Sequence, residues 1–120
     1  MAAKRILLLE DEGDVRELYG LGLRSAGYQV DVARTVAQAH QQLAVSRFDL
    51  VIVDLRLPDG DGSQIADQAA DQGSKTCIVS SYLFHAPATL DPGHEVLMKP
   101  VRPRALVAAV ERLIGPAGGT

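Results

Sequence analysis

The sequence predicts an α/β protein built around a parallel β-sheet. Five short apolar runs alternate with longer segments whose apolar residues recur at helical spacing. The runs are residues 6–9, 28–33, 50–53, 76–79 and 96–98. Because strands that alternate with helices form successive βαβ units, we expect the five strands to lie parallel in one sheet. The chain has 120 residues, 47% of them hydrophobic, which is enough for one domain with its own core.

The first helical segment lies between the first two runs. Its apolar residues recur at helical spacing and predict one buried face, formed by Val15, Leu18, Tyr19, Gly22, Leu23 and Ala26. Gly27 then ends the helix as a C-terminal cap. Gly20 and Gly22 each weaken the helix by roughly 1 kcal/mol relative to alanine. Either tertiary packing offsets this cost, or the backbone approaches a neighbouring element at these positions.

The second helix begins with a capping-box pattern, because Thr35 stands three residues before Gln38. Its inward face is formed by Val36, Ala39 and Leu43. His40 lies beside this face, and neither it nor His85 and His94 has the spacing of a zinc site. We therefore expect no metal site made of histidines.

The last helix has Pro103 in its first turn and ends at Gly115 and Pro116. Its apolar face is formed by Leu106, Ala109, Val110, Leu113 and Ile114. These limits predict one domain over residues 1–115, followed by a flexible tail over residues 116–120.

The segment before the last strand departs from the regular alternation of strands and helices. A full crossover helix is expected between two parallel strands, but residues 82–94 contain Pro87, Pro92 and Gly93. We therefore expect at most a short or irregular helix there. The fourth crossover, which joins the last two strands, would then have a degraded helix.

Charge and composition exclude several classes of protein. The formal net charge is −3 and no basic stripe is visible, so we expect no direct binding of nucleic acid. The apolar run 6–9 is too short for a signal-peptide core or a membrane span, which predicts a cytoplasmic protein without a membrane partner. Cys77 lies within an apolar run and is expected to be a buried, inert thiol.

Acidic residues follow two strands of the predicted sheet. The first strand runs into Glu10, Asp11 and Glu12, and the third runs into Asp54. In an open parallel sheet, ligands bind at these carboxyl ends. Such a cluster repels itself, and its oxygen atoms suit a hard cation such as Mg²⁺. The alternative is a solvated acidic patch, because acidic residues often begin helices.

A basic group and a hydroxyl are expected at the same edge. Lys99 follows the last strand and brings an ammonium group, and Ser80 and Ser81 leave the fourth strand. Each signal is weak alone, but together with the carboxylates they indicate a site for a phosphoryl group.

The order of these residues resembles the response-regulator receiver family of bacterial two-component signalling. The resemblance covers almost the whole chain and is carried by the segments 8–12 (LLEDE) and 53–62 (VDLRLPDGDG), by Ser80, and by Lys99 with Pro100. It implies a flavodoxin-like, doubly wound sheet of five parallel strands in the order 2-1-3-4-5.

The resemblance also implies a role for each site residue. Asp54 would accept a phosphoryl group, Ser80 would bind that group and Lys99 would neutralise it. The ligands of Mg²⁺ would be Glu10, Asp11, Asp54 and the main-chain carbonyl of Arg56. The Lys99–Pro100 bond is expected to be cis, since proline lowers the trans preference to about 0.5–1 kcal/mol. Pro58 and Gly62 would shape the loop after Asp54.

The expected activity is that of a switch. A histidine kinase or a histidine phosphotransferase would donate the phosphoryl group, and a downstream protein would recognise the changed surface. The chain would be no enzyme in the usual sense, although it would carry intrinsic autophosphorylation and autodephosphorylation chemistry.

Two residues depart from the family pattern, and the choice of the hydroxyl residue is open. Glu10 stands where an aspartate is commoner, and Val96 stands where the family often has an aromatic residue. Ser81 is an alternative to Ser80 as the hydroxyl residue. Together with the degraded crossover, Val96 favours a second interpretation, a pseudo-receiver that binds proteins without being phosphorylated.

Two other kinds of site are disfavoured. Asp59 and Asp61 lie in a stretch that looks like the start of an EF-hand loop, but the later ligands and the closing glutamate are missing. A phosphatase with a nucleophilic aspartate would need a second acid where Arg56 stands.

Overall fold

The computed structural model describes residues 3–81 and 93–117 of the chain. The main sheet consists of β1 (Arg5–Leu9), β2 (Gln29–Ala33), β3 (Leu50–Asp54), β6 (Lys75–Ser80) and β7 (Glu95–Met98). The helices are α1 (Gly13–Ser25), α2 (Val36–Val45), α3 (Ser63–Asp71) and α4 (Pro103–Ile114). Two short strands, β4 (Arg56–Leu57) and β5 (Gly60–Asp61), form a separate antiparallel pair.

The five main strands are all parallel and lie in the order β2-β1-β3-β6-β7. Counted along the chain, this is the predicted order 2-1-3-4-5, so the doubly wound flavodoxin-like topology is confirmed. In this order the chain moves to one side of β1 and then to the other, which leaves a switch point between β1 and β3.

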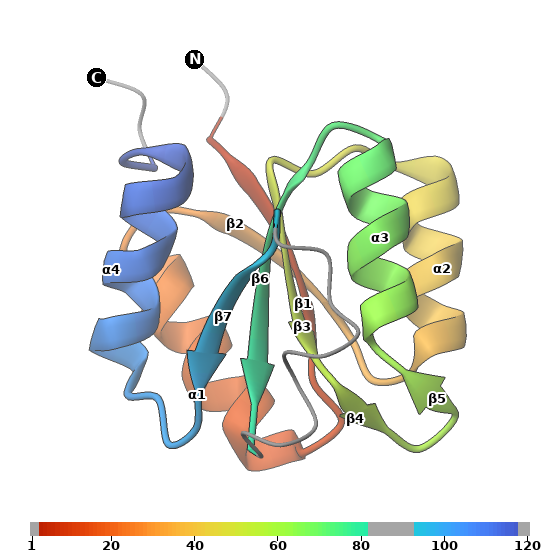
Figure 1. The fold of residues 1–120 in the computed structure, drawn as a ribbon. Helices are drawn as coiled ribbons and strands as arrows, with labels where there is room; N and C mark the ends of the chain where they lie inside the picture. The colour runs from red at the N-terminus through yellow and green to blue at the C-terminus, as the bar shows by residue number, and fades with distance from the viewer. Residues whose placement is uncertain (1–2, 82–92, 118–120) are drawn as a thin grey trace.

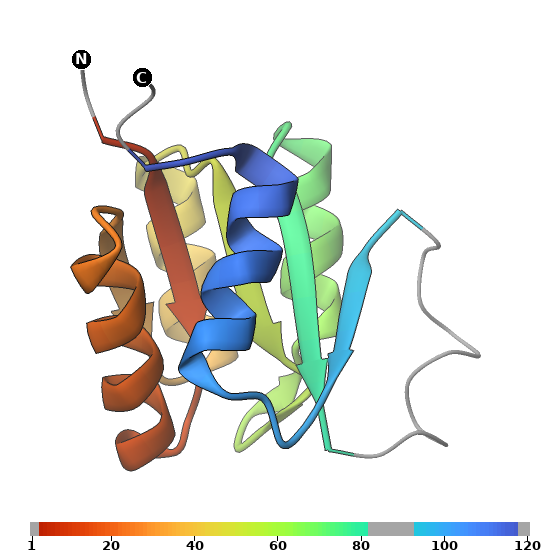
Figure 2. The same ribbon diagram turned by 90° about the vertical axis from the view of Figure 1, so that its left-hand side faces the viewer.

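The sheet is covered on both faces, as Figures 1 and 2 show. Helices α1 and α4 cover one face, and α2 and α3 cover the other. Because both faces are buried, β3 is apolar along most of its length and all five of its residues are buried. The alternating residues of β1 belong to two separate cores, with Leu7 and Leu9 on the side of α2 and α3 and Ile6 and Leu8 on the other side.

The predicted helix signals are largely confirmed. The Thr35 side chain accepts a hydrogen bond from the N–H of Gln38 at the start of α2 (3.1 Å). The side chain of Gln38 does not return to Thr35 but accepts from the N–H of Arg34 (2.8 Å), so the capping box is displaced by one residue. Gly27, with φ of 101°, follows the end of α1 as predicted.

The predicted buried face of α1 is wrong at two positions, because Leu18 and Ala26 are both exposed. Tyr19 and Leu23 are buried, but the side chain of Leu18 is 54% exposed. At 3.6 residues per turn, Leu18 lies roughly 120° around the helix from the midpoint between Tyr19 and Leu23, so apolar spacing alone placed it too far inward. Ala26 follows the last residue of α1, where the helix ends. Leu21 is exposed as well, at 63%, and lies next to Leu18 on the surface of the helix.

The two glycines of α1 serve different purposes. A Cβ atom on Gly22 would lie 3.2 Å from Cβ of Pro103, so the backbones of α1 and α4 approach closely there. A Cβ atom on Gly20 would meet only the end of the Arg24 side chain, at 3.3 Å. Close approach therefore accounts for Gly22, whereas nothing in the packing requires Gly20.

Substitution of these glycines by alanine should separate the two effects. We expect Gly20→Ala to stabilise the protein by up to about 1 kcal/mol, because alanine is the better helix former. Gly22→Ala should instead lose about 1 kcal/mol or more, because the added methyl group pushes α1 away from α4. Urea unfolding measures both changes. Equal changes in the two variants would contradict the close packing at Gly22.

Most of the predicted degraded crossover, residues 82–92, lies outside the described part of the chain. His94, at the end of the segment, is buried and shares hydrogen bonds with Thr76 and Asp67. At the C-terminus, Ala117 is also buried, and its carbonyl accepts from the N–H of Lys4 (3.4 Å). Packing therefore extends two residues past the predicted boundary at residue 115. Among the described residues no helix has the length and apolar character needed to cross a membrane.

Candidate functional site

The predicted site residues gather at one edge of the sheet, the lower edge in Figure 1. Glu10 and Asp11 follow β1, Asp54 ends β3, and Lys99 follows β7. The strands are parallel, so their carboxyl ends meet at this edge, and β1 and β3 are neighbours at the switch point. The sheet topology thus accounts for the meeting of side chains that are far apart in the sequence.

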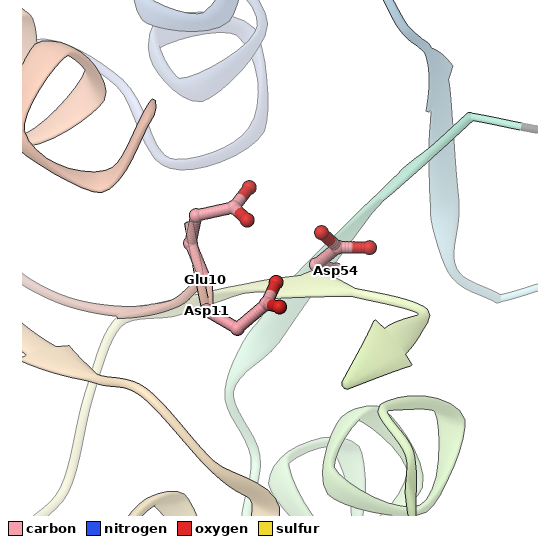
Figure 3. Close-up of side chains that lie close together, drawn as sticks. All are labelled: Glu10, Asp11 and Asp54. Carbon is pink, nitrogen blue, oxygen red and sulfur yellow. The ribbon is translucent and has the colours of Figure 1, made fainter. Parts of the chain in front are cut away.

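Three carboxylates form the centre of the site. Glu10, Asp11 and Asp54 each offer an oxygen atom, and these atoms lie within 4.8 Å of one another. Figure 3 shows the three side chains directed toward a common space. Glu10 is 2% exposed and Asp54 7%, whereas Asp11 is exposed. A set of carboxylate oxygens at this spacing fits a hard divalent cation, so these residues could bind a metal.

Lys99 supplies the positive charge that faces the carboxylates. Its ammonium nitrogen lies 3.1 Å from Glu10 Oε1 and 3.1 Å from Asp54 Oδ2. The Lys99–Pro100 bond is cis, as predicted, and the N–H of Lys99 donates to the carbonyl of Ser80 (2.7 Å). Burial disfavours the ammonium ion, but the charges of Asp54 and Glu10 outweigh it, so the pKa of Lys99 is raised.

Glu10 shows that the cluster is short of positive charge. Its pKa is raised from the ordinary value of 4.5 to about 7, first because the side chain is buried and second because Asp54 repels its charge. The Lys99 hydrogen bond and charge oppose this rise without cancelling it. One ammonium group therefore does not fully balance the buried carboxylates, and a bound cation would relieve the remaining repulsion.

The hydroxyl residue lies next to the lysine. Ser80 is the last residue of β6, is 3% exposed, and pairs in register with Met98. Ser81, by contrast, is exposed. The structure therefore brings the predicted residue Ser80 to the edge that carries Asp54 and Lys99, while its role in binding a phosphoryl group stays a prediction.

The loop after Asp54 is built by β4 and β5, which the sequence did not predict. Gly62 lies against the backbone of Asp54, since an added Cβ atom would be 2.2 Å from the Asp54 carbonyl oxygen and 2.3 Å from Cγ1 of Val53. The main chain of Arg56 follows Asp54 closely in this loop. The expected metal contact of the Arg56 carbonyl stays a prediction.

Asp59 has a role that sequence reasoning missed. Its carboxylate accepts hydrogen bonds from the N–H groups of Val36 (2.8 Å) and Ala37 (3.1 Å) at the start of α2. These hydrogen bonds lower the pKa of Asp59. Asp61 accepts from the N–H of Ser63 at the start of α3 (2.8 Å). Both side chains thus cap helices, and the helix start at Val36 was the signal that could have suggested a partner for Asp59.

Comparison with known proteins points to one family. Residues 6–111 match the family model described as the response regulator receiver domain. The chain is 32% identical to the response regulator receiver protein CpdR of Brucella abortus, over 92% of this chain and 97% of CpdR. It is 35% identical to the response regulator protein PilR of Pseudomonas aeruginosa, and the match spans 97% of this chain but only 28% of PilR.

Solved structures agree with this comparison. A CheY-like receiver domain from Methanospirillum hungatei is 28% identical, with a TM-score of 0.84 over 92% of this chain and 93% of that one. The response regulator TrrA of Thermotoga maritima, crystallised in complex with Mg²⁺ and BeF, is 26% identical, with a TM-score of 0.82 over 92% of this chain and 98% of that one. The similarity to both structures therefore covers about nine-tenths of this chain.

Proposed function

The chain belongs to the response-regulator receiver family, and from this premise we propose that it is a phosphorylation switch whose acceptor is Asp54. The proposal rests mainly on the position of Lys99, whose ammonium nitrogen lies 3.1 Å from the Asp54 carboxylate. This carboxylate is buried at the end of β3 beside Glu10 and Asp11. Phosphoryl transfer requires an acceptor carboxylate that is aligned for attack and has a positive charge beside it.

Mg²⁺ is the cation that we propose for the acidic cluster. Its ligands would be Glu10, Asp11, Asp54 and the main-chain carbonyl of Arg56, with water completing the set. The oxygen donors fit such an ion, and the crystal structure of TrrA was obtained with Mg²⁺ and BeF. When bound, the ion would supply positive charge for the oxygens of the phosphoryl group.

The residues of the chain would do the rest of the chemistry. A carboxylate oxygen of Asp54 forms a bond to phosphorus while the bond between phosphorus and the donor's imidazole nitrogen breaks, and the imidazole leaves with the electron pair. The Lys99 ammonium group faces the transferred oxygens and offsets their charge, and the Ser80 hydroxyl donates a hydrogen bond to one of them. The product is an acyl phosphate on Asp54, which water later hydrolyses.

In the cell we propose the following partners for this switch. The donor is a histidine kinase or a histidine phosphotransferase, and a downstream protein reads the phosphorylated surface. The chain acts in the cytoplasm without direct contact to nucleic acid or membrane. It is an acceptor with intrinsic autophosphorylation and autodephosphorylation chemistry, and it has no separate substrate to turn over.

A pseudo-receiver is the second candidate function. It is favoured by Val96, which is 37% exposed in β7 at the place where the family often carries an aromatic side chain. Such a protein would keep the fold and bind its partner without phosphorylation.

Incubation with acetyl phosphate separates the two functions. With Mg²⁺ we expect intact-mass spectrometry to show the gain of one phosphoryl group, and with excess chelator we expect none. Folded protein that stays unmodified with Mg²⁺ would support the pseudo-receiver instead. Phosphorylation that is undiminished in chelator would refute the metal requirement.

A further inference from the structure

Helix α1 contacts the main chain of the acidic cluster through one side chain. The Arg16 nitrogen Nη1 donates to the carbonyl oxygens of Glu10 (3.0 Å) and Asp11 (3.2 Å). Both carbonyls belong to the turn that joins β1 to α1. A single guanidinium group therefore fixes the backbone of two of the three residues in the carboxylate cluster.

Glu10 has a second main-chain contact in this turn, because its N–H donates to the carbonyl of Ala33 (3.1 Å). Glu12, the residue that precedes α1, makes no side-chain capping bond, although its N–H donates to Glu10 Oε2 (3.2 Å). Asp11 is exposed, so packing does not hold its carboxylate in place. The direction of the Asp11 side chain consequently depends on the conformation of the main chain, which Arg16 holds.

The same face of α1 also reaches the other half of the site. Tyr19, one turn beyond Arg16, is 4% exposed, and its hydroxyl donates to the carbonyl of Val101 (2.9 Å). Val101 follows Lys99 and Pro100 directly. Burial raises the pKa of Tyr19, and the charges of Lys99, Glu10 and Asp54 also act on it, as expected for a side chain beneath the site.

We propose that Arg16 and Tyr19 are positioning residues, in which Arg16 sets the cation-binding turn and Tyr19 sets the loop that carries Lys99. The inference rests on the proposed function, because it assigns these contacts to Mg²⁺ binding and phosphoryl transfer. Arg16 would determine the affinity for the ion, and Tyr19 the rate of transfer once the ion is bound.

Charge and geometry make opposite predictions for Arg16. A guanidinium group near a cation site repels Mg²⁺, so its removal should by itself strengthen binding. Loss of the two hydrogen bonds to Glu10 and Asp11 should weaken binding, because groups that orient metal ligands typically contribute about 10–100-fold to affinity. The sign of the change therefore decides between the two effects.

The first test measures Mg²⁺ affinity by isothermal titration calorimetry in folded protein without any phosphodonor. We expect Arg16→Met to weaken binding about tenfold, and Arg16→Lys, which keeps a charged donor, to restore part of it. The control is Arg24→Met, which removes a positive charge from the same helix and a hydrogen bond to the carbonyl of Val30 (2.8 Å). Affinity in Arg16→Met that is unchanged or tighter, or a loss that Arg24→Met reproduces, would overturn the assignment of Arg16.

The second test measures the rate of phosphorylation by acetyl phosphate at saturating Mg²⁺. We expect Tyr19→Phe to slow the reaction about tenfold, because small misplacement of a reacting group is costly, while its Mg²⁺ affinity stays within about twofold of wild type. Arg16→Met should be slow at low Mg²⁺ but should reach most of the wild-type rate once Mg²⁺ saturates the variant. If both variants lowered affinity and rate in the same proportion, the two residues would be merely structural and the proposal would fail.

Failure of the proposed function gives a different result. A folded wild-type protein that binds no Mg²⁺ and gains no phosphoryl group would refute the switch itself. Normal wild-type behaviour with unaltered variants would refute only the roles of Arg16 and Tyr19.

Discussion

Replacement of Lys99 by methionine should destabilise the metal-free protein by about 3 kcal/mol at pH 8, because it leaves buried carboxylates without their counter-ion. The ammonium nitrogen contacts Glu10 and Asp54, whose side chains are 3% and 9% exposed. Methionine has a similar length, so the packing of the stem is largely kept. The expected loss is therefore electrostatic and should depend on pH.

The sign of the pH dependence follows from Glu10. Its pKa in the folded protein, about 7, lies above its ordinary value of 4.5. Protonated Glu10 thus contributes stability that is complete below about pH 4.5 and is lost as the pH rises through 7. Without Lys99, which lowers this pKa, the loss continues to higher pH. We expect the variant to differ from wild type by only about 1 kcal/mol at pH 5, where Glu10 is protonated in both proteins.

Urea unfolding in chelator at pH 5 and pH 8 measures this difference. Lys75→Met is the matched control, because Lys75 is exposed at the start of β6 and should change stability little at either pH. A loss in Lys99→Met that is the same at both pH values would show that the ammonium group does not act on the Glu10 carboxylate.

The second large effect is expected at Gly62. An added Cβ atom would overlap the Asp54 carbonyl oxygen at 2.2 Å and Cγ1 of Val53 at 2.3 Å, and both neighbours belong to the central strand β3. The backbone must move to admit a methyl group, so Gly62→Ala should cost about 3 kcal/mol or more. Because the clash involves Asp54 itself, phosphorylation should slow as well.

Gly13→Ala is the control for this substitution. Its added methyl group would meet only the end of the Arg16 side chain, at 3.7 Å, in the first turn of α1. Thermal unfolding should therefore show a change of at most about 1 kcal/mol in that variant. A Gly62→Ala protein as stable as wild type would mean that the loop after β3 moves freely away from Asp54.

The sequence predicted the sheet and the central side chains of the site because both follow from local patterns. Apolar runs identified the five strands, and the convergence of parallel strand ends then brought Glu10, Asp11, Asp54 and Lys99 to one edge. The capping residue Thr35 was also a local signal, since its partner is only three residues away.

Other features depend on contacts between segments that are distant in the sequence. Such contacts cannot be predicted from the local spacing of apolar and polar residues. Asp59 caps a helix that begins 23 residues earlier in the chain. Tyr19 reaches Val101 across 82 residues. Leu18 fits the apolar spacing of α1 but faces outward, because the part of the helix that the sheet covers is narrower than the apolar stripe. Such details require the packed structure.

The site of phosphorylation tests the assignment of Asp54 as the acceptor most directly. Intact-mass spectrometry after incubation with acetyl phosphate and Mg²⁺ should show one added phosphoryl group on the wild type and none on Asp54→Asn. Asp59→Asn, in which the amide oxygen can still cap α2, is the matched control and should be phosphorylated like wild type. A phosphoryl group on folded Asp54→Asn, or none on the wild type, would contradict the assignment of Asp54 as the acceptor.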